Sequence, residues 1–177
     1  MLRNVQFDEK ILILHPAAQF GFVESLRLLI EKGANVDKLW TNDGTTPLHM
    51  TSQNGHVECE RLLMEKGADV DKARTNDGAT PLLVASENGQ VECVRLLIEK
   101  GADVDKARPN DGTTPPHAAS QNGHVECVLL LVANGADVKA KAKKYDTPRQ
   151  VAKTAEIRQI LLEADVRSPT NCWCARR

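Results

Sequence analysis

The sequence predicts an all-α solenoid of stacked helix-turn-helix units with protruding hairpin fingers, and two observations lead to this fold class. The first is a repeat. The pentapeptide GADVD begins at Gly67 and again at Gly101, and the related GANVD and GADVK begin 34 residues before and after them. The second is internal identity, since residues 42–75 and 76–109 agree at 25 of 34 positions. A fixed period of this length is the signature of a repeat architecture.

Each unit carries signals for two short helices separated by a turn. In the second unit Thr46 is a good N-cap and Pro47 suits the first helical position, so a helix should begin there and run to about Gln53. The Asn-Gly pair that follows should end the helix, because Gly55 readily adopts the left-handed backbone conformation. Residues 57–66 should form the second helix, which ends at the next glycine.

The rest of each unit should form a finger. Residues 68–79 contain an Asn-Asp-Gly turn signal and no helical pattern, so we expect an extended hairpin. Neither helix could stand alone, because roughly 7–10 residues is below the ~12–15 needed for a marginal isolated helix. The second helix has an apolar set that one unit cannot bury, so neighbouring units must stack.

These motifs, taken in order, resemble the ankyrin repeat. In the second unit they are Thr-Pro-Leu-His at 46–49, Asn-Gly-His-Val-Glu at 54–58, Arg-Leu-Leu-Met-Glu at 61–65 and Gly-Ala-Asp-Val-Asp at 67–71. The resemblance covers about residues 12–164. It implies an ankyrin-repeat solenoid, whose fingers and first helices line a concave face that holds a partner.

We divide the chain into a leading segment, five units and a tail. The ranges are 1–11 for the N-terminal segment, 12–41 for a degenerate first unit, 42–75, 76–109 and 110–142 for the internal units, 143–164 for a cap and 165–177 for a tail that we expect to be disordered. In the first unit Pro16 falls where a backbone N–H would close the first helical bond, so we expect that helix to begin late.

Charge and hydropathy restrict the classes of partner. The net charge of −1 gives the whole chain no bulk attraction to nucleic acid or anionic lipid, and we expect neither as the partner. Residues 1–137 carry 13 Lys and Arg against 20 Asp and Glu, net −7, whereas residues 138–177 carry 10 against 4, net +6. The longest aliphatic run, residues 11–14, is too short for a signal peptide or a membrane span. We expect an intracellular monomer.

No pattern predicts catalysis, a cofactor or a metal site. The five histidines occupy repeat positions, where the family resemblance implies local hydrogen bonding. Cys59, Cys93 and Cys127 recur once per unit, and helices stacked ~8–10 Å apart cannot bring them within disulfide distance. We expect these cysteines to be small buried residues. Cys172 and Cys174 form a C-x-C pair, but two ligands alone do not make a zinc site.

The candidate binding residues occupy two positions on each finger. We call the set the finger stripe: Trp40, Arg74 and Arg108 at one position, and Lys38, Lys72 and Lys106 at the other. Trp and Arg are the side chains most often found at binding hot spots, and Trp40 is not copied between units. The alternative is a solvated basic edge, offset by Asp43, Asp77 and Asp111, because duplication alone would copy Lys and Arg.

Two further features depart from the repeat pattern. Glu60 stands where the other units have Leu or Val, and a lone carboxylate there is costly unless exposed or paired. We therefore expect Glu60 at an edge, beside Arg27 or Arg95. The lysines of the last finger could dock an acidic partner or form a soluble edge of the cap: Lys139, Lys141, Lys143 and Lys144.

Together these features predict a non-enzymatic scaffold or adaptor that binds a partner protein through the concave finger and first-helix surface. An alternative is a stoichiometric inhibitor or regulatory subunit of an enzyme such as a kinase, because short proteins of the ankyrin family include kinase inhibitors. A third hypothesis assigns nucleic acid or anionic lipid to the basic C-terminal end, and such binding should weaken steeply with salt.

Overall fold

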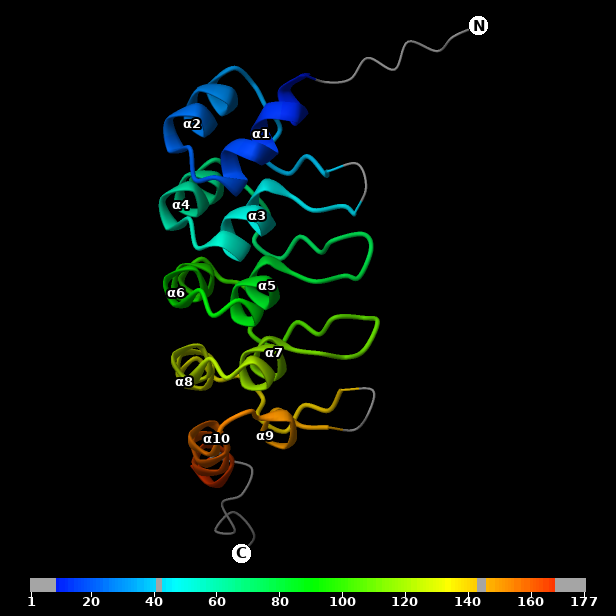
Figure 1. Cartoon of the computed structure of the whole chain (residues 1–177), viewed down its shortest axis with the longest axis vertical. Coiled ribbons are helices and arrows are strands. Elements are labelled where there is room, and N and C mark those ends of the chain that lie inside the picture. The colour runs from blue at the N-terminus through cyan, green and yellow to red at the C-terminus, as the bar shows by residue number, and fades with distance from the viewer. Residues whose placement is uncertain (1–8, 41–42, 143–145, 168–177) are drawn as a thin grey trace, which may run out of the picture.

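The computed structural model describes residues 9–40, 43–142 and 146–167, and within these ranges it contains ten helices and no strand. The helices form five stacked pairs, and fingers project from the stack on one side (Figure 1). This arrangement confirms the predicted all-α solenoid. The pairs are α1 (Glu9–Gln19) with α2 (Val23–Glu31), α3 (Pro47–Asn54) with α4 (Val57–Glu65), α5 (Pro81–Glu87) with α6 (Val91–Glu99), α7 (Pro115–Asn122) with α8 (Val125–Ala133), and α9 (Pro148–Val151) with α10 (Ala155–Arg167).

The pairs build two parallel rows. The first helices form an inner row beside the fingers, and the second helices form an outer row on the far side (Figure 1). Helix α3 packs against α1 and α5 in the inner row, and α4 packs against α2 and α6 in the outer row. Each unit therefore contacts its immediate neighbours, as expected for a solenoid.

Local signals determine the helix ends as the sequence predicts. The Thr46 side chain caps α3 by accepting a hydrogen bond from the backbone N–H of His49. Pro47 occupies the first helical position, where its missing N–H has no intrahelical partner to lose. Gly55 ends α3 with a φ of 75°, a left-handed conformation that a side chain would disfavour.

Helix α1 corrects the expectation for the first unit. It begins at Glu9 rather than late, and Pro16 lies inside it. Proline removes one intrahelical donor, but the helix continues, and the N–H of Phe20 bonds to the Pro16 carbonyl at 2.9 Å. The prediction assumed that the missing N–H of Pro16 would delay the start of the helix. Packing of α1 against α3 offsets the single hydrogen bond that proline removes.

The ends of the stack differ from the predicted boundaries by a few residues. Helix α1 starts before residue 12, and α10 continues to Arg167, beyond residue 164. Residues 1–8 of the predicted leading segment and residues 168–177 of the predicted tail, with its Cys-x-Cys pair, lie outside the described residues.

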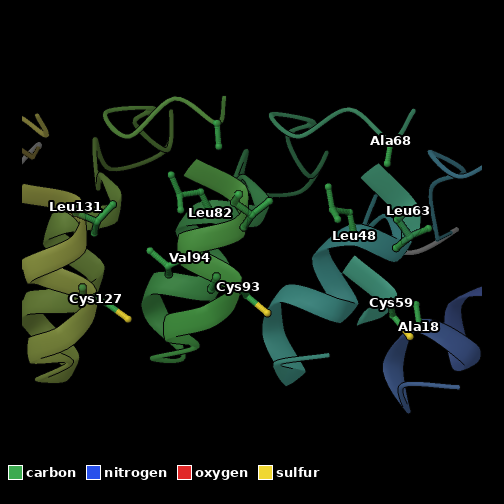
Figure 2. Close-up of a cluster of buried hydrophobic side chains, with 14 of the residues drawn as sticks. Ala18, Leu48, Cys59, Leu63, Ala68, Leu82, Cys93, Val94, Cys127 and Leu131 are labelled. Atoms are coloured by element: carbon green, nitrogen blue, oxygen red, sulfur yellow. The ribbon is translucent and has the colours of Figure 1, made fainter. Parts of the chain in front are cut away.

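A continuous apolar core runs between the two rows (Figure 2). Leu48 and Leu82 from the inner row and Leu63, Leu97 and Leu131 from the outer row are each fully buried. Burying one such leucine stabilises the fold by roughly 1.5–3 kcal/mol. The three cysteines that recur once per unit are also buried and form no disulfide, which confirms the sequence prediction: Cys59, Cys93 and Cys127.

Exposure at the first unit shows how much each unit depends on its neighbour. Leu28 in α2 is 56% exposed, whereas its equivalents Leu62 and Leu96 are 4% and 3% exposed. Phe20 and Phe22, in the turn between α1 and α2, are also exposed. Leu28 lies in the first described pair, where no earlier pair covers the helix, and Leu130, next to the C-terminal pair, is only partly buried.

Buried histidines tie successive units together. The Nδ1 atom of His49 accepts from the N–H of Thr46 at 3.2 Å, and its Nε2 donates to the carbonyl of Ala79 in the next finger at 2.9 Å. His117 makes the equivalent contacts with Thr114 and Asp146. Burial lowers the pKa of His49 to about 4, so the ring is neutral at pH 7. These contacts confirm the predicted structural role of the histidines.

We expect His49→Leu to lower the free energy of unfolding by about 1–3 kcal/mol, because it leaves buried polar partners unsatisfied. The measurement is urea unfolding followed by circular dichroism at pH 7.5. His124→Gln is the control. His124 bonds to the Glu87 carbonyl across a unit boundary, and Gln90 makes the equivalent bond to Gln53, so stability should stay within about 0.5 kcal/mol. Equal losses in the two variants would contradict the assignment.

Candidate functional site

The six residues of the finger stripe lie at equivalent sequence positions on the three fingers that join the first four helix pairs. Figure 1 shows these fingers projecting from the stack beside the inner row. Trp40, Arg74 and Arg108 each begin the turn that closes a finger. Their backbone N–H groups bond across the finger to Thr45, Ala79 and Thr113 at 2.7, 2.9 and 2.8 Å. The lysines lie two residues earlier in each unit, near the base of the finger.

Each finger arginine is bound by an aspartate of its own finger. Nε and Nη2 of Arg74 donate to the two carboxylate oxygens of Asp77 at 3.1 and 2.7 Å, a bidentate pair. Arg108 and Asp111 form the same pair at 3.1 and 2.6 Å. The side chains of Arg74 and Arg108 are only 18% and 22% exposed. The arginines thus close the finger tips.

A charged contact and a backbone hydrogen bond link successive fingers. Nη1 of Arg108 lies 4.0 Å from the carboxylate of Asp77, and the N–H of Asn76 donates to the Asp43 carbonyl at 3.2 Å. The hydrogen bond from Arg108 holds the pKa of Asp111 well below its usual range. Burial alone would raise the pKa of Asp43, but hydrogen bonds from Thr45 and the charge of Arg74 lower it overall. The result is a ladder of alternating charges.

The lysines of the finger stripe have different surroundings. Lys38 and Lys106 are exposed and Lys72 is half-buried. Within the described ranges none of the three forms an ion pair. The positive charge that remains open to a ligand on these fingers therefore comes from the lysines, while the arginine charge is largely compensated.

Trp40 is half-buried, which its sequence position did not reveal. Its ring packs against the buried ring of His15, with centroids 4.8 Å apart and an interplanar angle of 59°. The aromatic contact orients Trp40, and the accessible part of the ring lies at the N-terminal end of the finger stripe. A ring held in place loses little conformational freedom when a ligand packs on it.

Glu60 is not at an edge, so the sequence-based expectation was wrong. It is fully buried in α4, and its Oε1 accepts a hydrogen bond from the Ser52 hydroxyl at 2.6 Å. Arg27 and Arg95 pair instead with glutamates of their own helices. Burial raises the pKa of Glu60 to about 7, although hydrogen bonds from Ser52 and from Cys93 of the next unit oppose the rise.

The neighbouring units show what Ser52 contributes. The equivalent serines, Ser86 and Ser120, are also buried, but Val94 and Val128 replace the glutamate. In the part of the chain that the structure describes, the hydroxyls of Ser86 and Ser120 have no hydrogen-bond partner. The regular spacing of the serines was visible in the sequence, but the pairing of Ser52 with Glu60 was not.

Neither a metal-binding cluster nor a membrane-spanning helix occurs among the described residues. Their His, Cys, Asp and Glu side chains form no cluster of three or more that could hold a metal ion. None of their helices combines the length and apolar character needed to cross a bilayer. What the structure does supply is a repeated surface, built from equivalent finger and inner-helix positions on successive units.

Comparison with known proteins agrees with this architecture. A family model for ankyrin repeats (3 copies) matches residues 2–74 and 71–142. No curated protein matches the chain significantly. Because this family model covers most of its length, the chain belongs to the ankyrin repeat family, whose domains are generally protein-binding modules. Helices α9 and α10 extend the stack beyond the matched residues, since α9 packs on α7 and α10 on α8.

Glu60→Gln should change how stability depends on pH. Glu60 titrates near 4.5 when unfolded and near 7 when folded, so its stabilising contribution is complete below pH 4.5 and is lost as the pH rises through 7. Between pH 5 and pH 8, wild type should lose about 2–3 kcal/mol of unfolding free energy relative to E60Q. Urea unfolding at both pH values measures this difference.

The comparison with E60Q is needed because His49 titrates in the opposite sense. Its folded pKa is lowered, so its contribution is present above its usual pKa of 6.5 and is lost as the pH falls towards 4. Wild type and E60Q both contain His49, so its effect on stability cancels when the two proteins are compared. Parallel pH profiles for wild type and E60Q would show that Glu60 is not buried as described.

Asp77→Asn tests the charged ladder, because Asp77 contacts the guanidinium groups of both Arg74 and Arg108. We expect the free energy of unfolding to fall by about 0.5–1.5 kcal/mol, a modest loss because the pairs are partly exposed. The control is Glu65→Gln, an exposed residue with no ion pair among the described residues, which should change little. Chemical unfolding at 150 mM NaCl compares both variants with wild type. Equal stability of all three proteins would show that the Arg–Asp pairs do not stabilise the fingers.

Proposed function

We propose that this chain is a non-enzymatic adaptor that binds a partner protein through the concave surface formed by its fingers and inner helices. The observation that carries the proposal is the stacking of three equivalent fingers, with the oriented Trp40 ring at one end and uncompensated lysines along them. Stacked repeats create extended surfaces of this kind, on which successive units contact successive parts of one ligand.

The two kinds of stripe residue have different roles in this proposal. Arg74 and Arg108 hold the finger tips through Asp77 and Asp111, so they present a shaped surface rather than free charge. Lys38, Lys72 and Lys106 attract an acidic partner surface and favour its association rate. The partly exposed Trp40 provides an apolar anchor, which is the type of residue that commonly dominates binding energy.

The test is affinity capture from cell lysate with the full chain and two variants. The stripe variant combines Trp40→Ala with charge reversal at the three lysines: Lys38→Glu, Lys72→Glu and Lys106→Glu. The arginines are left intact because their loss would disturb the fingers themselves. The control variant reverses three exposed cations of the outer row: Arg61→Glu, Lys66→Glu and Lys100→Glu.

We expect the stripe variant to lose specific partners that wild type and the control variant retain, with all three proteins showing the same helical circular dichroism spectrum. An unchanged set of captured proteins would count against the finger stripe. If the captured partner is a single enzyme that loses its activity in a stoichiometric complex, the protein is an inhibitor rather than an adaptor. An intracellular location and a monomeric state remain predictions of the sequence.

A further inference from the structure

A hollow of about 330 Å³ lies at the C-terminal end of the stack, lined by the last finger, α9 and α10. Of its two apolar lining residues, Val138 is half-buried and Leu161 is fully buried. Lys139, Lys141 and Arg149 contribute three cationic side chains, and all three residues are exposed. The volume is at the lower end of the ~300–1,000 Å³ typical of ligand pockets. It suits one or two side chains rather than a large cofactor.

The cations at this hollow are compensated less than the arginines of the preceding fingers. Lys139 pairs with Asp165, which also lines the hollow, at 2.7 Å. Lys141 and Arg149 form no ion pair with any residue that the structure describes. By contrast, Arg74 and Arg108 are each bound by an aspartate of their own finger. Two cations therefore remain open beside a mostly polar hollow.

The charge of the rest of the chain restricts which anion fits. Residues 1–137 carry a net charge of −7, and residues 138–177 carry +6. A long polyanion such as nucleic acid, or a broad anionic membrane, would meet the acidic part of the stack as well as its basic end. A short acidic peptide needs to contact only the basic end. The chemistry of the hollow thus favours a peptide with carboxylates beside an apolar side chain.

We propose that this C-terminal hollow binds an acidic peptide segment of a partner protein. Carboxylates of the peptide pair with Lys141 and Arg149, and an apolar side chain packs against the half-buried Val138. A bound carboxylate also competes with Asp165 for Lys139, because the two would share one ammonium group. The site is separate from the finger stripe, and neither proposal depends on the other.

The experiment is fluorescence anisotropy with the full-length chain and a labelled ten-residue peptide in which leucines are flanked by glutamates. The double variant Lys141→Glu with Arg149→Glu should bind about tenfold more weakly than wild type at 50 mM NaCl. The control, Arg61→Glu with Lys100→Glu, makes the same charge change on the outer row and should stay within about twofold. All the substituted residues are exposed, so circular dichroism should be unchanged.

Two further arms distinguish a defined site from general attraction. Asp165→Asn removes the competing carboxylate and should tighten binding by about twofold or more. A peptide with lysine in place of glutamate should not bind. Equal weakening in the two double variants, or no binding of the acidic peptide to wild type at 50 mM NaCl, overturns the proposal. So does binding of single-stranded DNA or phosphatidylserine vesicles in place of the peptide.

Discussion

The structure depends on burial of apolar side chains between units that are too short to fold alone. The internal helices have seven to nine residues, which is too few for a stable isolated helix. Leu62 and Leu96 in internal units are almost fully buried, whereas the equivalent Leu28 in the first unit is 56% exposed. Helix formation and stacking are therefore one event, and the stability of each unit is shared with its neighbours.

Polar contacts determine how the stacked units align. Histidines of the inner row reach the carbonyls of the next finger, and aspartates at the finger bases accept backbone N–H groups from the next unit, as Asp71 does from Asp103. The Arg–Asp ladder continues this alignment at the finger tips. Each contact recurs in successive units. Displacing any single unit relative to its neighbours would therefore break several of these bonds at once. Glu60 is the exception, since it adds a buried charge site to one interface only.

The ladder also changes how the proposed binding surface should be understood. Similar cationic residues along the fingers have two distinct surroundings: the arginines are bound to aspartates, and the lysines form no ion pair with the described residues. At the C-terminal end, Lys141 and Arg149 also form no ion pair with any described residue. Compensation by neighbouring carboxylates, rather than the number of basic residues, decides where an acidic ligand can gain energy.

The sequence by itself determined the repeat period, the helix ends and the buried cysteines, because caps, proline and glycine act within a few residues and apolar spacing reports the buried face. Only the tertiary structure decided the surroundings of Glu60 and Arg108. Cys93, which contacts Glu60, belongs to the next unit, and Asp77, which lies near Arg108, belongs to the preceding finger. It also decided that α1 continues through Pro16, since packing on α3 offsets a local penalty. Local signals predict elements, but long-range contacts decide which charges are buried, paired or free.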